Sequence, residues 1–197
     1  MVVGIAGPAG SGKSTVCRLL SRRPGFVHLD CDEIAKGFYA PNGPAYRDVV
    51  RAFGPGILAA DGSIDRRRLA ELALPDPEKR EQLEAIVHPL VVRAIRERIG
   101  KERDRGAAVL LVEGALLFHS PHVPRELFDL AVWLEAPEEV RRRRLLSAGI
   151  PPELVALRLA AQRDLSPPPW AEVVDASRPL DAVTRDVAGL IEKKGAR

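Results

Sequence analysis

The strongest chemical signal lies near the N-terminus, where residues 7–14 read GPAGSGKS. This G-x-x-x-x-G-K-[ST] pattern follows the apolar run Val2–Ala6 and precedes a helix-like stretch, the strand–loop–helix setting of a phosphate-binding loop. Its glycines let backbone N–H groups point inward at a polyphosphate, next to the positive end of a helix. The ordinary alternative is a glycine-rich turn, which explains neither the full match nor its flanks. We therefore expect a nucleoside triphosphate to contact Ala9, Gly10, Ser11, Gly12, Lys13, Ser14 and Thr15.

Two residues of this loop have side chains suited to phosphoryl chemistry. We expect the Lys13 ammonium to reach the terminal phosphates as a point charge. The Ser14 hydroxyl is the expected ligand of a Mg²⁺ ion bound with the triphosphate.

Acidic residues end two of the predicted strands. Asp30 and Asp32 follow one strand, where a carboxylate can accept a hydroxyl proton or hold a Mg²⁺-bound water. Helix N-capping is an equal alternative for Asp30, whereas the position of Asp32 favours function. Glu113 ends another strand as a candidate metal-side carboxylate, with capping or pairing with an arginine as its alternatives. The apolar segment 114–118 after it suits a pocket wall, so Leu117 and Phe118 are candidate substrate contacts.

Arginines follow the next strand at positions 141–144. Four consecutive residues cover all faces of a helix, so only one or two of them can face a transferring phosphoryl group. The others are expected on a solvated surface, and Arg158 and Arg163 are alternative sources of the positive charge.

The pair His88-Pro89 interrupts a long helical pattern. Proline removes a backbone donor and restricts the residue before it, so we expect the helix to end or kink there. His88 is a candidate substrate contact, although a lone histidine is more often structural.

Strands and helices alternate along the chain, which favours an α/β fold with a three-layer, doubly wound parallel sheet. Most strand candidates are continuous apolar runs, as expected of strands buried on both faces. The strand candidates are Val2–Ala6, Phe26–Asp30, Val109–Val112, Leu130–Leu134 and Glu172–Asp175. The helix candidates are Ser14–Ser21, Tyr46–Phe53, Arg66–Leu72, Pro77–Glu102, Pro137–Ser147, Pro152–Gln162 and Leu180–Lys193.

We expect the 197 residues to form one domain with two added parts. The core comprises about residues 1–33, 107–147 and 171–197. A helical insertion at about 34–106 is the expected home of the second substrate, and the proline-rich segment at about 148–170 is the expected lid.

We expect a soluble, cytoplasmic protein, a monomer or a weak homo-oligomer, whose partners are small molecules. It is 46% hydrophobic and 29% charged, with a formal net charge of only +3, so no general affinity for nucleic acid follows. No apolar run approaches the length that spans a bilayer, and no signal peptide is visible. Cys17 and Cys31 form neither a metal-binding pair nor a disulfide framework, and two free thiols indicate a reducing compartment.

Taken together, these segments resemble the dephospho-CoA kinases, the last enzymes of coenzyme A biosynthesis, over nearly the whole chain. The resemblance is carried by GPAGSGKST, Asp30-Cys-Asp-Glu-Ile34, Phe53-Gly54, Asp61-Gly-Ser-Ile-Asp65-Arg66, Val87-His-Pro-Leu90, Glu113-Gly-Ala-Leu-Leu-Phe118 and Ala161-Gln162. The loop alone indicates only a nucleotide-binding protein, and the combination is far more specific.

The resemblance implies that the γ-phosphate of ATP is transferred to the ribose 3′-hydroxyl of dephospho-CoA, with Mg²⁺. Asp32 would be the base or orienting group for that hydroxyl, while Lys13 and Arg144 stabilise the phosphoryl group. The insertion would bind the CoA moiety, and the segment after Arg144 would close as the lid. Two other readings stay open: another nucleoside or nucleotide kinase, and a catalytically weak sensor of nucleotide or CoA.

The chain departs from the family pattern at several positions. Glu113 stands where the family usually has Asp, and Ala115 and His119 replace a proline and an acid. Val92 replaces an arginine, Ser147-Ala148-Gly149 replaces the Arg-Asp of the lid, and Ala176 replaces an asparagine that could touch adenine.

Overall fold

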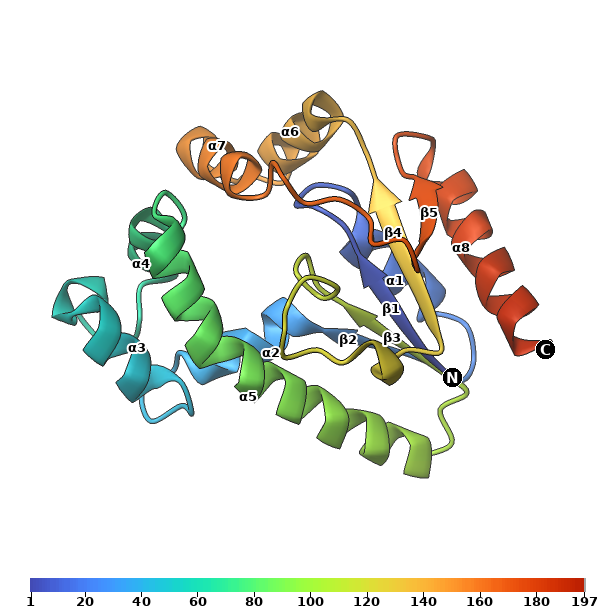
Figure 1. Cartoon of the computed structure of the whole chain (residues 1–197), viewed down its shortest axis with the longest axis horizontal. Helices are drawn as coiled ribbons and strands as arrows, with labels where there is room; N and C mark the ends of the chain where they lie inside the picture. Colours follow the sequence, from blue (N-terminus) through green and yellow to red (C-terminus); the bar gives the residue numbers. More distant parts are fainter. Residues whose placement is uncertain (197) are drawn as a thin grey trace.

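A five-stranded parallel sheet forms the centre of the computed structural model, which describes residues 1–196 (Figure 1). Its order is β2-β3-β1-β4-β5, so consecutive strands are joined by crossovers rather than hairpins. The strands are β1 Val2–Ala6, β2 Phe26–Asp30, β3 Val109–Glu113, β4 Leu130–Glu135 and β5 Glu172–Asp175. The expected doubly wound α/β fold is confirmed, with every predicted strand present.

Helices cover both faces of the sheet because both faces are apolar. On β1, Val3 and Ile5 belong to the core cluster under α1 (Lys13–Leu20) and α8 (Leu180–Gly195). Val2 and Ala6 belong to a second cluster, beneath the helices that connect β2 to β3. This alternation along one strand gives the sheet a buried layer on each side.

The connection from β2 to β3 contains four α-helices and one 3-10 turn, which extend beyond the sheet (Figure 1). They are α2 Cys31–Phe38, α3 Tyr46–Phe53, η1 Pro55–Ile57, α4 Arg66–Ala73 and α5 Pro77–Asp104. Helix α2 is not among the predicted helices, because it is short and contains Gly37. Its Asp30 cap and its packing against α5 compensate for the weak local sequence.

Helix α5 does not end at Pro89: it runs continuously from Pro77 to Asp104. This confirms the helix predicted over Pro77–Glu102, and of the two outcomes expected at Pro89, an end or a kink, the end does not occur. Val87 and Val91, one on each side of Pro89, are both buried in the core. Their packing compensates for the backbone hydrogen bond that the proline removes.

Two helices follow β4: α6, Glu138–Ser147, and α7, Pro152–Ala161 (Figure 1). The connection from β3 to β4 holds only a short turn, η2, Arg125–Leu127. Helix α7 meets α4 of the preceding connection, where Arg67 and Glu153 form an ion pair at 3.0 Å. The part of the chain predicted as a lid therefore touches the part predicted as a helical insertion, and both assignments stay predictions.

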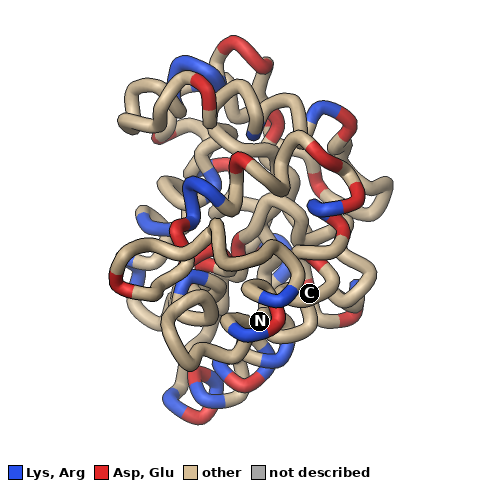
Figure 2. The backbone as a smooth tube through the Cα atoms, turned by 90° about the vertical axis from the view of Figure 1, so that its left-hand side faces the viewer, with Lys and Arg blue, Asp and Glu red and all other residues tan. Residues whose placement is uncertain are grey.

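Charges of both signs are interspersed along the backbone in the view of Figure 2. Within residues 1–196, no helix is both long enough and apolar enough to cross a membrane.

Truncation of a buried side chain on a central strand should strongly destabilise the fold. Leu110 of β3 is fully buried, so Leu110→Ala should lower the free energy of unfolding by about 3 kcal/mol through lost burial and a residual cavity. Urea unfolding followed by circular dichroism measures this. Leu72→Ala is the matched control, because Leu72 is 41% exposed and its truncation should cost about 0.5 kcal/mol or less. Equal losses in the two variants would contradict this account of the core.

Candidate active site

The phosphate-binding loop, residues 7–14, joins the carboxyl end of β1 to α1. Gly7 and Gly10 have positive φ values of 140° and 82°. A Cβ atom at Gly7 would lie 2.3 Å from the Leu134 carbonyl oxygen, and one at Gly10 would lie 2.6 Å from that of Arg141. The loop is thus pressed against β4 and α6, and glycine is required at both positions for geometry and for space.

Lys13 is the first residue of α1, and its ammonium lies over the loop. The Nζ atom donates a hydrogen bond to the Pro8 carbonyl at 3.2 Å. Burial lowers the pKa of Lys13, while the nearby carboxylates of Glu113 and Asp32 act in the opposite direction. A cation held at a helix N-terminus, with carboxylates beside it, is suited to a polyphosphate and its metal ion.

The carboxyl end of β2 carries two acids with different roles. Asp30 caps α2: its carboxylate accepts hydrogen bonds from the backbone N–H groups of Asp32 at 2.8 Å and Glu33 at 3.1 Å. Of the two roles considered for Asp30, the structure supports helix capping. Asp32 stands in the first turn of α2 with an exposed side chain, so its carboxylate is available to a ligand.

Glu113 ends β3 at the same edge of the sheet, in register with Asp30 of β2 and Ile5 of β1. It is almost completely buried, and its Oε1 lies 3.0 Å from Nε2 of His28. Its partner is thus a histidine rather than an arginine or a helix end. Its second oxygen, Oε2, is buried without a hydrogen-bond partner within the described residues.

Sequence reasoning missed His28. The available signal was a polar residue inside an otherwise apolar strand, at a position that faces α1. His28, Cys17 and Glu113 also form a group whose potential metal-ligand atoms all lie within 4.8 Å of one another.

The side chains of the four arginines of α6 have different surroundings, because consecutive residues of a helix point to different sides. Arg141 is buried and donates to the Ala136 carbonyl at 3.1 Å, Arg142 pairs with Glu138, and Arg143 is exposed. Of the four, Arg144 is the one that contacts two loops, the phosphate-binding loop and the loop after β5. Its Nη1 lies 3.3 Å from the Ser11 carbonyl of the phosphate-binding loop, and its Nη2 donates to the Ala176 carbonyl at 2.8 Å.

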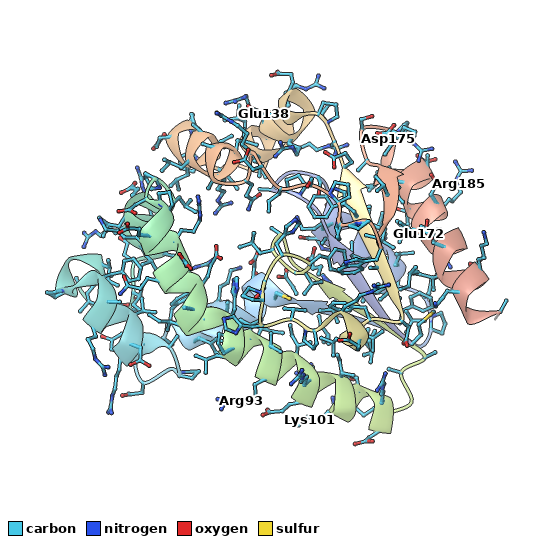
Figure 3. All side chains as sticks on the ribbon, in the orientation of Figure 1. Arg93, Lys101, Glu138, Glu172, Asp175 and Arg185 are labelled. Carbon is cyan, nitrogen blue, oxygen red and sulfur yellow. The ribbon has the colours of Figure 1, made fainter. Side chains whose placement is uncertain are left out.

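A pocket of about 730 Å³ opens beside Arg144. One end is formed by the phosphate-binding loop and the start of α1. The other end is formed by residues 176–178, after β5, and by Leu180 and Val183 of α8. Asp175, which begins this loop, stands at the carboxyl end of β5 (Figure 3).

Gln162, at the end of α7, contacts the loop from the predicted lid. Its Oε1 accepts a hydrogen bond from the Ala9 backbone N–H at 2.6 Å. This residue is absent from the predicted site, although the segment Ala161-Gln162 is among those that carry the family resemblance. The Ala9 N–H of the phosphate-binding loop therefore has a hydrogen-bond partner in the segment predicted as the lid.

The remaining candidate substrate contacts are His88, Leu117 and Phe118. His88 packs edge-on against His122, with ring centroids 6.5 Å apart; burial, with a smaller contribution from His122, lowers the pKa of His88 to about 4. Leu117 is in the core, and Phe118 packs edge-on against Phe128 and Trp170. Their roles in substrate binding stay predictions.

Known proteins resemble this chain over most of its length. The family model described as dephospho-CoA kinase matches residues 1–167. A dephospho-CoA kinase of Symbiobacterium thermophilum is 37% identical over 166 residues, which cover 83% of this chain and 68% of the relative. One of Carboxydothermus hydrogenoformans is 32% identical over 98% of this chain and 93% of the relative.

Solved structures show the same fold. The crystal structure of TT1252 from Thermus thermophilus has a TM-score of 0.73 and 30% identity, covering 98% of this chain and 97% of its own. A dephospho-CoA kinase from Campylobacter jejuni has a TM-score of 0.58 at 20% identity, covering 98% and 96%, and supports the fold alone. With its phosphate-binding loop, its acidic strand ends and a family match over most of its length, the chain belongs to the dephospho-CoA kinase family.

Proposed function

We propose that this chain carries out the family's reaction, the transfer of the γ-phosphate of ATP to the ribose 3′-hydroxyl of dephospho-CoA, at the carboxyl edge of its sheet. The observation that carries this proposal is the position of Lys13 and Asp32, which lie in the first turns of the helices that follow β1 and β2 at the carboxyl edge of the same parallel sheet. A phosphate-binding cation thus stands beside an exposed carboxylate that can face an acceptor hydroxyl.

The donor binds along the pocket beside Arg144, with its polyphosphate on the loop. Backbone N–H groups and Lys13 bind the β- and γ-phosphates, and Lys13 neutralises charge that develops on the transferring group. Arg144, anchored on the loop carbonyls, is the second cation at this position. Since phosphoryl transfer depends mainly on alignment and charge neutralisation, this short set of groups is sufficient.

The acceptor approaches from the side of α2. The Asp32 carboxylate accepts a hydrogen bond from the 3′-hydroxyl, orients its oxygen in line with the bond to the leaving group, and takes its proton as transfer proceeds. Asp30 holds the first turn of α2 by its cap and so fixes the direction of Asp32. His88 and Phe118 are proposed contacts for the remainder of the CoA molecule.

The residues present fit a Mg²⁺ ion. Glu113 offers Oε2, which is buried without a hydrogen-bond partner within the described residues, and Ser14 offers its hydroxyl; both are oxygen donors of the kind that Mg²⁺ prefers. When bound, the ion would supply positive charge that offsets the negative charge of the phosphates. His28 holds the other carboxylate oxygen and thereby fixes the orientation of Glu113.

Removal of divalent metal should stop transfer. With excess EDTA, we expect CoA formation to fall by at least about 10³-fold, since the charge that the metal supplies is lost. Added Mg²⁺ should restore the rate. Undiminished CoA formation in EDTA would contradict the assignment of Ser14 and Glu113 as metal ligands.

An acceptor panel tests the function itself. The purified chain is incubated with ATP, Mg²⁺ and either dephospho-CoA, a set of nucleosides and nucleotides, or pantothenate, and ADP release is followed. We expect turnover with dephospho-CoA only. Turnover of a nucleoside instead would indicate another kinase, and ATP binding without any turnover would indicate a sensor.

We also propose that the chain acts in the cytoplasm on these two small molecules, without nucleic acid. The free thiols of Cys17 and Cys31 support a reducing compartment.

A further inference from the structure

We infer that Cys17, His28 and Glu113 form a binding site for a transition-metal ion, with Zn²⁺ as the ion that fits the ligands best. The atoms of these three side chains that can coordinate a metal all lie within 4.8 Å of one another. A thiol sulfur and an imidazole nitrogen are ligands of zinc and not of Mg²⁺, so this site goes beyond the metal ion of the proposed function.

The fold brings the three side chains together beneath α1. Leu111 of β3 belongs to the core cluster that packs under α1, so Glu113, two residues further along the strand, faces the same side of the sheet. His28 of the neighbouring strand β2 shares this side, since Phe26, two residues before it, packs against the same cluster. Cys17 is a buried residue of α1 and meets the two strand residues from the helix.

The three ligands are closely spaced, and two of them are buried. Cys17 is fully buried, and Glu113 is 2% exposed. Nε2 of His28 lies 3.0 Å from Oε1 of Glu113, whereas Oε2 of Glu113 has no hydrogen-bond partner within the described residues. Around a tetrahedral zinc ion, sulfur, nitrogen and oxygen ligands lie about 3.3–3.6 Å apart, so side-chain shifts of about 1 Å are sufficient to close the site.

The charges of the ligands match a divalent ion. The Glu113 carboxylate and the Cys17 thiolate together neutralise Zn²⁺, so the ion is not left as an unpaired charge in a buried place. Burial raises the pKa of the Cys17 thiol, but a coordinating metal deprotonates a thiol outright, and the proton passes to the solvent. The imidazole of His28 supplies a third, neutral ligand.

A second pocket, of about 710 Å³, gives the site a path to solvent. Its lining includes His28 of the edge strand β2, Arg18 of α1 and Lys101 of α5. The His28 side chain is 18% exposed, so it is the ligand that an entering ion meets first. Zinc sites with three protein ligands hold water in the fourth position, and this pocket can supply it.

Occupation of the site should inhibit phosphoryl transfer, a consequence that rests on the proposed function. Glu113 is the proposed carboxylate ligand of Mg²⁺, and a zinc ion held by Cys17 and His28 would engage the same carboxylate. Because Mg²⁺ does not bind thiolate or imidazole at this site, we expect zinc to lower the rate by at least about tenfold even when Mg²⁺ is saturating.

Cobalt substitution tests the site independently of activity. Co²⁺ takes the same kinds of ligand as Zn²⁺, and a thiolate bound to it produces a charge-transfer band in the near ultraviolet. The full chain is titrated with Co²⁺ without nucleotide, and then with Zn²⁺. We expect stoichiometric Co²⁺ to produce the band and Zn²⁺ to abolish it. Absence of the band from the wild-type chain would overturn the inference.

Variants of the two cysteines identify the ligand. Cys17→Ser and Cys17→Ala should both lose the band and weaken Zn²⁺ binding by at least about 100-fold in calorimetry, with thermal unfolding as the check on folding. Cys31→Ser is the matched control, because Cys31 is also a free thiol but lies outside the group of three, and it should keep both the band and the affinity. A band that survives both Cys17 variants, or that is lost with Cys31, would overturn the inference.

The inhibition is measured as CoA formation at saturating Mg²⁺ and a buffered concentration of free Zn²⁺, relative to the zinc-free rate of each chain. We expect at least about a tenfold loss for the wild type and less than about a twofold loss for Cys17→Ser. Zinc binding without inhibition would overturn the inhibitory consequence. If the zinc-free wild type forms no CoA, the proposed function fails, while the cobalt band still decides whether the metal site exists.

Discussion

Lys13→Met should abolish phosphoryl transfer while the chain stays folded. The ammonium is the one cation of the phosphate-binding loop, and its hydrogen bond to Pro8 holds it over the site where the terminal phosphates bind. Groups that stabilise developing charge in a preorganised site contribute about 10²–10⁵-fold to rate. Since methionine preserves the length of the side chain and removes its charge, we expect kcat/KM for ATP to fall by at least about 10³-fold.

The measurement is CoA formation under steady-state conditions, with thermal unfolding as a check on folding. Burial lowers the pKa of Lys13, so loss of its charge should not destabilise the protein. Lys101→Met is the matched control, because Lys101 projects from α5, away from the sheet edge (Figure 3). A Lys13 variant with more than about one tenth of the wild-type rate would contradict the assignment of the loop.

Asp32→Asn should separate donor binding from transfer. Asparagine retains the size of the side chain and can still accept a hydrogen bond, but it can neither take a proton nor supply negative charge. General-base groups contribute about 10²–10⁴-fold, so we expect kcat to fall by at least about 10²-fold. The Kd for ATP should change by less than about threefold, since Asp32 contacts the acceptor rather than the donor.

The neighbouring position provides the control for Asp32. Glu33 is exposed on the same turn of α2 and pairs with Lys36, so Glu33→Gln should leave kcat essentially unchanged. Near wild-type transfer by Asp32→Asn would show that Asp32 neither orients the hydroxyl nor accepts its proton. An equal loss in both variants would indicate a general effect of charge on α2.

Local sequence patterns predicted most of the fold because the relevant signals are short. Apolar runs such as Val2–Ala6 specify buried parallel strands, and the loop motif specifies the turn that follows. Helix α2 could not be predicted in the same way, and the sequence alone did not decide whether α5, predicted over Pro77–Glu102, ends or kinks at Pro89. Both depend on tertiary packing that offsets unfavourable local residues, Gly37 in one and Pro89 in the other.

The positions of candidate site residues could be predicted where a motif fixes the backbone. Their hydrogen-bond partners could not, because these depend on the tertiary structure. Lys13 and Asp32 follow from motif and strand position. The partners of Glu113 and Arg144 do not, because the pairs His28–Glu113 and Arg144–Ala176 join residues 85 and 32 positions apart. Such pairs form only once the strands are in register and α6 is docked.

The nature of the bond that forms gives the most direct test of the proposed reaction. Phosphorus NMR of the purified chain with ATP, Mg²⁺ and dephospho-CoA should show a new phosphomonoester on the ribose 3′-oxygen, growing in equal amount with ADP. Release of inorganic phosphate without this ester, or esterification at a different hydroxyl, would contradict transfer of the γ-phosphate to the 3′-hydroxyl.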